Sequence, residues 1–124
     1  MILVDTSVWV DHFRRGDAQL VDLLKRNAVI MHPFVVGEIA CGSLTDRALI
    51  LGLLQELPGA VVALPDEVFG FIERHHLAGM GIGYVDVHLL ASVALGGTKL
   101  WTRDKRLGAV AEGLDVASYD SGAN

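Results

Sequence analysis

The chain has few cysteines, few aromatic residues and no long apolar run, and each shortage excludes a class of protein. Its single cysteine among 124 residues cannot form an internal disulfide or a cysteine cage for a metal, as expected in a reducing cytoplasm. No apolar run approaches the roughly 20 residues that cross a bilayer. The opening MILVDTSVW has no basic segment and reaches an acid at its fifth residue. We therefore expect neither a membrane segment nor a signal peptide.

The chain also lacks an excess of basic residues. Its 10 lysines and arginines against 15 aspartates and glutamates give a net charge of −5. This balance argues against nonspecific coating of nucleic acid, but it permits an enzyme with local basic patches. The hydrophobic fraction of 52% is too high for a disordered chain. The length predicts one domain over residues 1–124, with a short flexible tail from about residue 118.

Short apolar runs alternate along the chain with longer amphipathic ones. The short runs predict strands at Ile2–Val4, Ala28–Met31, Val61–Leu64, Lys99–Thr102 and Leu114–Val116. The longer runs predict helices over Ser7–Arg14, Ala18–Arg26, Pro33 to about Gly42, Thr45–Leu57, Asp66–Ala78 and Val85–Leu95, and a short helix ending near Glu112. Strands that alternate with helices form βαβ units, so the predicted fold class is α/β with a mostly parallel, doubly wound sheet.

Four acidic residues fall near the carboxyl edge of this predicted sheet, where such folds bind their ligands. Asp5 follows the first strand and Asp104 follows the fourth. Asp86 opens the helix that leads back to the fourth strand. Glu38 lies about five residues into its helix, roughly 7 Å below the edge at 1.5 Å per residue. We therefore expect these four acids to converge from distant segments of the chain.

Helical periodicity places two of these acids among apolar neighbours. Glu38 shares a face with Val35, and Asp86 shares a face with Leu89 and Leu90. We therefore expect Glu38 to point into an apolar stripe rather than to solvent. An isolated ionised carboxylate in such a place is costly unless it is paired or bound to a metal. Each of the other three acids, taken alone, also fits a capping or turn role, and their joint placement favours a site.

A cluster of carboxylates needs a way to limit its own repulsion, which is roughly 4 kcal/mol per pair at 4 Å in an effective dielectric of 20. Either the pKa values of the acids rise or a hard cation neutralises them. An all-oxygen site with room for water and phosphate suits Mg²⁺, and Mn²⁺ is expected to substitute for it. The five histidines show no ligand spacing, and we expect them to be ordinary surface or satisfied histidines.

Four segments of the chain carry a family resemblance. They read ILVDTSVW, PFVVGEIACG, GYVDVHLLAS and LWTRDKRL, in this order, and span the chain from Met1 to about Val116. Together they resemble a PIN-domain nuclease, and within that family they look like a VapC-type toxin of a bacterial type II toxin–antitoxin system. The resemblance implies a PIN-like three-layer α/β/α fold with a central, mostly parallel sheet. It carries the metal-binding and catalytic acids of the family onto Asp5, Glu38, Asp86 and Asp104, and its supporting hydroxyl groups onto Thr6, Ser7 and Thr102.

The resemblance also implies an activity and its partners. The expected activity is that of a Mg²⁺-dependent endoribonuclease, which hydrolyses a phosphodiester bond in tRNA or ribosomal RNA. Asp5 and Asp86 are the expected central ligands, and Thr102 would orient a liganding carboxylate. The expected partners are the RNA and a cognate small antitoxin of the VapB type. A homodimer and a toxin–antitoxin hetero-oligomer are expected as well, with no membrane.

Basic and apolar surfaces for these partners are visible in the sequence. Candidate RNA-binding residues lie in the first helix and beside the last acid: Arg14, Arg15, Arg103, Lys105 and Arg106. Each of them fits a solvated helix surface about as well. The helix Thr45–Leu57 contains LILGLL and is apolar beyond one face, which suits a homodimer and an antitoxin groove, although core packing explains much of it.

Three other functions compete with the nuclease. A receiver-like phosphoacceptor domain would also gather acids and Mg²⁺, but it needs an acidic pair after the first strand, where Asp5 stands alone before Thr6. A dehalogenase-like phosphatase needs an acid at the position of Ser7. The third alternative is a PIN fold that serves only as a binding module. The presence of all four acids favours an enzyme.

Overall fold

The computed structural model describes residues 1–118, and a short parallel sheet forms its centre. Its strands lie in the order β2-β1-β3, both pairings are parallel, and their bounds are Ile2–Val4 (β1), Val29–Ile30 (β2) and Lys99–Trp101 (β3). Val4 lies opposite Trp101 in the register, so the next residues of both strands leave the sheet at the same edge. Most of the predicted flexible tail falls on residues 119–124, outside the described residues.

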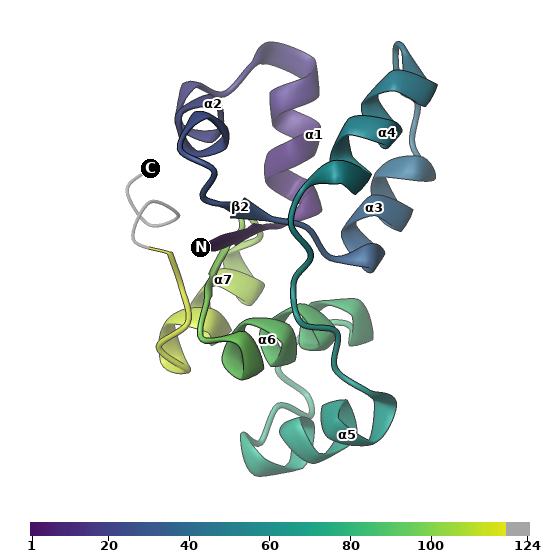
Figure 1. Ribbon diagram of the computed structural model, residues 1–124. Coiled ribbons are helices and arrows are strands. Elements are labelled where there is room, and N and C mark those ends of the chain that lie inside the picture. Colours follow the sequence, from purple (N-terminus) through teal and green to yellow (C-terminus); the bar gives the residue numbers. More distant parts are fainter. Residues whose placement is uncertain (119–124) are drawn as a thin grey trace.

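The described residues form seven helices around this sheet. Their bounds are Thr6–Arg15 (α1), Ala18–Lys25 (α2), Pro33–Ala40 (α3), Arg47–Glu56 (α4), Pro65–Arg74 (α5), Tyr84–Gly96 (α6) and Lys105–Gly113 (α7). Figure 1 shows α1 and α2 above the sheet and α5 and α6 below it. Helix α6 packs against β3, and α5 packs against α6. This arrangement confirms the three-layer α/β/α fold with a parallel sheet.

The core lies where the sheet meets these helices. Leu3 and Leu100 in the strands are fully buried, as are Leu89 and Leu90 on α6. Because helices cover both faces of a parallel sheet, its strands are apolar without alternation. No helix within residues 1–118 is long and apolar enough to cross a membrane.

Two of the predicted strands are wrong. The segments Val61–Leu64 and Leu114–Val116 form no strand, and the chain instead makes single bridges at the outer edges of the sheet, Met31 with Gly59 and Leu100 with Ala117. Val61 is 47% exposed, and its carbonyl accepts a hydrogen bond from the Ser92 hydroxyl instead of from a neighbouring strand. Val61–Leu64 has no partner strand and stays irregular, whereas the segment after Leu114 bonds to β3 only around Leu100, which is too short a stretch for a strand. The sequence pattern does not reveal how far such pairing extends.

Candidate functional site

Asp5 is the buried member of the site. The residue is 7% exposed, and its Oδ2 accepts hydrogen bonds from the Ser7 hydroxyl at 2.7 Å and from the Thr102 hydroxyl at 2.8 Å. Asp5 occupies the N-cap position of α1, but its side chain makes no capping hydrogen bond there. The capping role that the sequence left open therefore does not account for this side chain. Two hydroxyl donors fix the orientation of the carboxylate.

The same two hydroxyl groups join Asp5 to the segment after β3. Ser7 Oγ accepts the backbone N–H of Arg103 at 3.0 Å, and Thr102 Oγ1 accepts the backbone N–H of Asp104 at 3.1 Å. Thr102 thus contacts one predicted acid directly and holds the backbone of another. The structure places both of these predicted supporting residues beside Asp5.

Asp104 and Asp86 each lie at the start of a helix and use one oxygen there. Asp104 caps α7, where its Oδ1 accepts the backbone N–H of Leu107 at 3.0 Å. Asp86 lies in the first turn of α6, and its Oδ2 accepts the backbone N–H of Gly83 at 3.1 Å. A capping bond occupies one oxygen of a carboxylate, so the second oxygen of each acid stays available for a ligand.

Glu38 lies on the exposed side of the site, and its predicted burial in an apolar stripe is wrong. Val35 and Ile39 form the buried face of α3, and Glu38 falls at the margin of this face, where it is exposed. Its Oε1 accepts a hydrogen bond from the Thr6 hydroxyl at 2.7 Å. This bond joins α3 to the first residue of α1, directly after Asp5. The predicted supporting hydroxyl of Thr6 therefore contacts Glu38.

The other three acids act electrostatically on Asp86. The pKa of Asp86 is raised above its usual value of 3.8, first because burial disfavours the charged carboxylate. The hydrogen bond from Gly83 opposes this rise, and the negative charges of Asp5, Asp104 and Glu38 add to it. Because the charges of the other three acids raise the pKa of Asp86, all four lie near one another, as the sequence predicted.

The chemistry of these oxygens fits a hard divalent cation. Within residues 1–118, each of the four carboxylates has one oxygen that receives no hydrogen bond from the protein. Within the same residues, no group of three or more histidine, cysteine or acidic side chains lies close enough together to hold a metal ion by itself. Mg²⁺ is commonly held by one or two carboxylates, while waters and substrate phosphate oxygens complete its shell. The donor set therefore fits Mg²⁺ with an open coordination sphere.

Two of the predicted RNA-binding arginines are already paired with acids. Arg103 contacts Asp11 at 2.7 Å and also pairs with Asp17, while Arg15 contacts Asp11 at 3.3 Å. Asp11 was not singled out from the sequence, although its spacing of four residues from Arg15 is typical of a helical ion pair. The candidates whose charge is not paired within residues 1–118 are Arg14, Lys105 and Arg106.

Two histidines are buried, which corrects the expectation of ordinary surface or satisfied histidines. His32 is fully buried and His88 is 4% exposed. His32 Nδ1 accepts the backbone N–H of Phe34 at 3.0 Å, but His32 Nε2 and His88 Nδ1 have no partner in the described part of the chain. Burial lowers the pKa of both rings, that of His32 to about 4 with a further contribution from His88. Both histidines are therefore neutral at pH 7.

This chain matches the model of one protein family, and the curated relatives that it resembles are named as ribonucleases. Residues 2–113 match the family model described as PIN domain. Proteins named Ribonuclease VapC32, from the CDC 1551 / Oshkosh and ATCC 25618 / H37Rv strains of Mycobacterium tuberculosis, are 50% identical to this chain over 118 residues, or 94% of this chain and 95% of the relative. A chain from the structure of FitAB bound to an IR36 DNA fragment has a similar fold. Its TM-score is 0.59 at 18% identity, covering 94% of this chain and 92% of that chain.

Proposed function

The chain belongs to the PIN-domain family as a VapC-type member, and on this premise we propose that it is a Mg²⁺-dependent endoribonuclease, the toxin of a type II toxin–antitoxin pair. It is a hydrolase of RNA phosphodiester bonds, and the substrate class that we propose is tRNA or ribosomal RNA. The observation that supports the proposal is the convergence of four carboxylates. In each of them one oxygen accepts a hydrogen bond from the protein and the other accepts none from the described residues.

Each acid has its own part in the proposed reaction. A bound Mg²⁺ supplies activation of water and stabilisation of the charge that develops on the scissile phosphate. Asp5 and Asp86 would hold the ion, and the hydroxyl groups of Ser7 and Thr102 fix the orientation of the Asp5 carboxylate. Asp104 completes the site directly or through water.

The exposed position of Glu38 gives it a different part. Glu38 is held on one oxygen by Thr6, which leaves the other oxygen to bind a second ion or to orient the attacking water. In the proposed reaction water attacks the phosphate, and no residue of the protein forms a covalent bond to RNA.

The test is RNA cleavage by carboxylate variants in the presence of Mg²⁺. Asp5→Asn and Asp86→Asn should both abolish cleavage of cellular RNA and growth inhibition, since Asn keeps the size of the side chain but removes its charge. Asp22→Asn is the matched control, because Asp22 makes a surface ion pair with Arg26 at 2.9 Å, and it should behave as wild type. Wild-type cleavage by a folded Asp86→Asn protein would remove the central claim.

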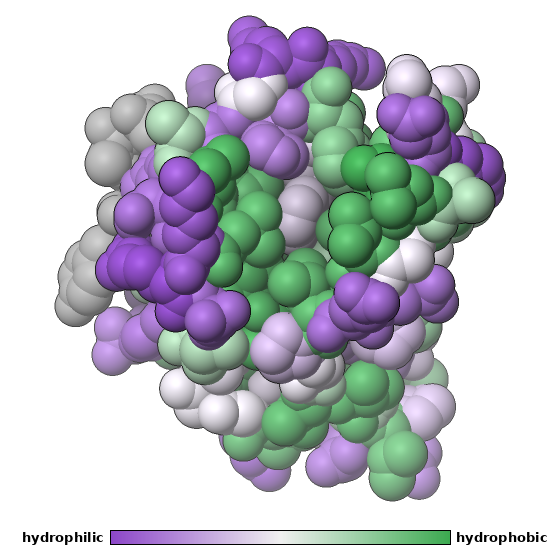
Figure 2. Space-filling view, turned by 45° about the horizontal axis from the view of Figure 1, so that its top comes forward, coloured by the Kyte–Doolittle hydropathy of each residue, from purple (hydrophilic) through white to green (hydrophobic). Residues whose placement is uncertain are grey.

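The partner that we propose for this chain is a small antitoxin of the VapB type. A cavity of about 630 Å³ lies between α1, α3 and α4, and Glu38 and Arg14 are among its lining residues. Figure 2 shows apolar side chains gathered over α4 beside a hollow. On this helix Leu49 is 62% exposed and Leu53 is 51% exposed. A segment with an apolar face and a basic side chain suits such a surface next to an acidic site.

Co-expression with the product of a neighbouring small gene tests this partner. We expect the two proteins to co-purify as a hetero-oligomer built on a toxin homodimer, with access of Mg²⁺ to the site reduced. Leu53→Glu should weaken the complex. Leu95→Glu is its control, because Leu95 is 53% exposed but lies on α6. Recovery of the free toxin alone, with the neighbouring product present, would contradict the proposal.

A further inference from the structure

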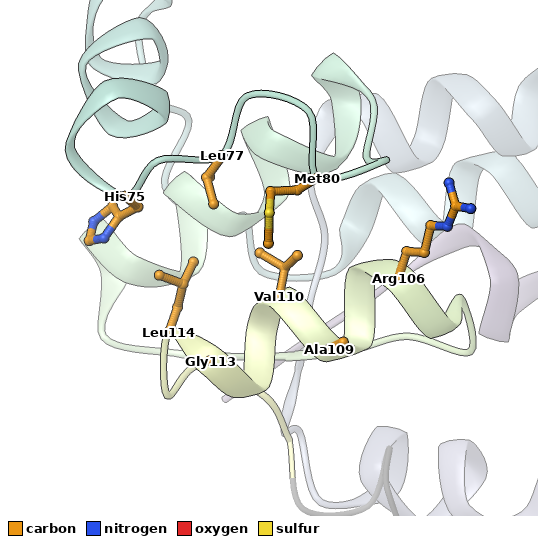
Figure 3. A pocket seen from close by; sticks show the side chains of 8 residues that line it. All are labelled: His75, Leu77, Met80, Arg106, Ala109, Val110, Gly113 and Leu114. Carbon is orange, nitrogen blue, oxygen red and sulfur yellow. The ribbon is translucent and has the colours of Figure 1, made fainter.

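A groove of about 380 Å³ runs between the turn after α5 and helix α7. Figure 3 shows His75 at one end of it, the apolar side chains of Met80 and Val110 in the middle, and Arg106 at the other end. The side chain of Arg106 extends away from the apolar lining and lies against Gly81, in the glycine-rich turn before α6. This arginine therefore contacts a second segment of the chain.

Gly81 fits beside Arg106 because it has no side chain. A Cβ at this position would lie 2.6 Å from Arg106 Nη1, closer than such atoms approach, and 3.0 Å from Arg106 Cδ, a tight contact. Gly81 also has a φ of +79°, in the left-handed region that favours glycine. Any other residue here would strain the turn and displace the guanidinium. The exposed side chain of Arg106 thus lies over backbone that a side chain at position 81 would cover.

The two segments that meet at this contact also carry two of the four acids. Gly83, two residues after Gly81, donates its N–H to Asp86. Asp104 caps helix α7 two residues before Arg106. The charges of Asp104 and Asp86 also act on each other. The contact between Arg106 and Gly81 therefore joins the two segments of the chain that carry these carboxylates.

The charge of Arg106 is not neutralised by the described part of the chain. Arg26 and Arg103 pair with aspartates, whereas no carboxylate of residues 1–118 lies within ion-pair distance of Arg106. Four clustered carboxylates repel an anionic nucleic-acid backbone wherever a bound cation does not screen them. The guanidinium of Arg106, on the segment that follows Asp104, offers a positive charge, and its planar fork of N–H donors matches the oxygens of a phosphate group.

We propose that Arg106, which lies against Gly81, binds a backbone phosphate of the RNA next to the scissile phosphate. The inference rests on the proposed ribonuclease function and adds to it the residue that sets the position of the strand. Arg106 donates two hydrogen bonds to nonbridging phosphate oxygens, and it neither forms nor breaks a covalent bond. Contacts of this kind fix the register of a nucleic acid and carry no base preference.

The experiment measures RNA affinity in the cleavage-deficient Asp86→Asn protein. A short fluorescein-labelled RNA of mixed sequence is titrated and followed by fluorescence anisotropy over a series of NaCl concentrations. Arg106→Gln should raise Kd about three- to tenfold at low salt. It should also lower the slope of log Kd against log [NaCl] by about 0.7, the value for one phosphate contact on a single strand. Arg106→Lys keeps the charge without the fork and should recover part of the affinity.

Two further variants separate position from charge. Gly81→Ala leaves the net charge unchanged but displaces the guanidinium, so it should also raise Kd. Arg26→Gln removes a surface arginine that pairs with Asp22 and should leave Kd and slope unchanged. In a protein with Asp86 restored, Arg106→Gln should keep the full rise of melting temperature in Mn²⁺, because Arg106 does not hold the ion.

An Arg106→Gln protein with unchanged Kd and unchanged salt slope would overturn the inference. Because Arg106 is exposed, this variant is expected to fold, and it decides the result even if Gly81→Ala unfolds. Failure of the proposed function would look different. In that case the wild type would not cleave RNA with Mg²⁺, while Arg106→Gln would still weaken RNA binding.

Discussion

Thr102 donates a 2.8 Å hydrogen bond to Asp5 across 97 positions of sequence. The bond joins the ends of β1 and β3, where the strands leave the sheet at the same edge. Thr102 also accepts the backbone N–H of Asp104. One buried hydroxyl therefore connects two acids of the site, and its removal tests whether that connection matters for activity.

Thr102→Val should lower RNA cleavage by about 10- to 100-fold, the usual cost of removing a group that orients a metal ligand. Valine keeps the shape of threonine but leaves Asp5 with one hydroxyl donor and the Asp104 N–H without an acceptor. The measurement is the initial rate of RNA cleavage at saturating Mg²⁺. Thr98→Val is the matched control, since the Thr98 hydroxyl is buried without a partner in residues 1–118 and its removal should not lower the rate. Equal rates for the two variants would contradict the proposed role.

Thermal melts with EDTA and with Mn²⁺ should show opposite effects of Asp104→Asn. A raised pKa means that Asp86 stabilises the fold most below its usual pKa of 3.8 and loses this contribution as pH rises through the folded-state value. At pH 7 the acid cluster therefore costs stability, and Asp104→Asn should raise the melting temperature in EDTA while its Asn still caps α7.

Mn²⁺ should stabilise the wild type by about 2.7 kcal/mol at a hundredfold excess over Kd. In Asp104→Asn this further rise should be smaller, since one of the acids has lost its charge. If the wild type shows no shift with Mn²⁺, and Asp104→Asn is simply less stable in EDTA, the four acids do not form one metal site.

Acid should unfold the protein in part through His32. The pKa of His32 falls from 6.5 to about 4 on folding because its ring is buried. The unfolded chain therefore binds more protons between these values, and stability is complete above pH 6.5 and lost as pH falls towards 4. The loss reaches about 3 kcal/mol. His32→Asn should flatten the pH dependence of stability measured by urea unfolding, because its side-chain oxygen can still accept the N–H of Phe34 but does not titrate. An unchanged slope between pH 6.5 and 4 would rule out this origin.

Arg103→Gln should lower stability rather than RNA affinity. The hydrogen bond from Arg103 is the first cause of the lowered pKa of Asp11, and Arg103 contributes to the lowered pKa of Asp17. These ion pairs act above the usual carboxylate pKa of 3.8 and are lost as pH falls below it. The variant should melt at a lower temperature at pH 7, and the difference should shrink in high salt. If Arg103→Gln melts at the normal temperature but binds RNA more weakly, the prediction is wrong and Arg103 contacts RNA.

The order of helices and strands was largely predictable because the chain changes its periodicity at each boundary. Asp5 follows an apolar strand directly and Asp104 comes shortly after another, so their shared edge of the sheet could be deduced from the sequence. The direction of the Glu38 side chain could not, since α3 is short and the face that it buries depends on its neighbours. The error at Val61–Leu64 has a similar cause, because strand formation requires a partner that the local sequence does not specify.

Contacts between distant segments account for the features that the sequence did not indicate. His32 and His88 lie on separate elements, and only the packed fold brings their rings within 6.5 Å. The glycine-rich turn was visible as a composition feature. Nothing in the pattern, however, indicated that Gly81 would lie against Arg106 from the last helix. Side-chain partners of this kind depend on tertiary packing.

The order of the strands in the sheet also sets a time at which the site can form during protein synthesis. The central strand β1 leaves the ribosome first, but its neighbour β3 begins only at Lys99. Until that stretch has emerged, Asp5 has neither Thr102 nor Asp104 beside it. A nascent chain therefore carries the helices α1 to α4 before it has a complete acidic site. A protein that binds those helices during translation can reach the chain before the site is assembled.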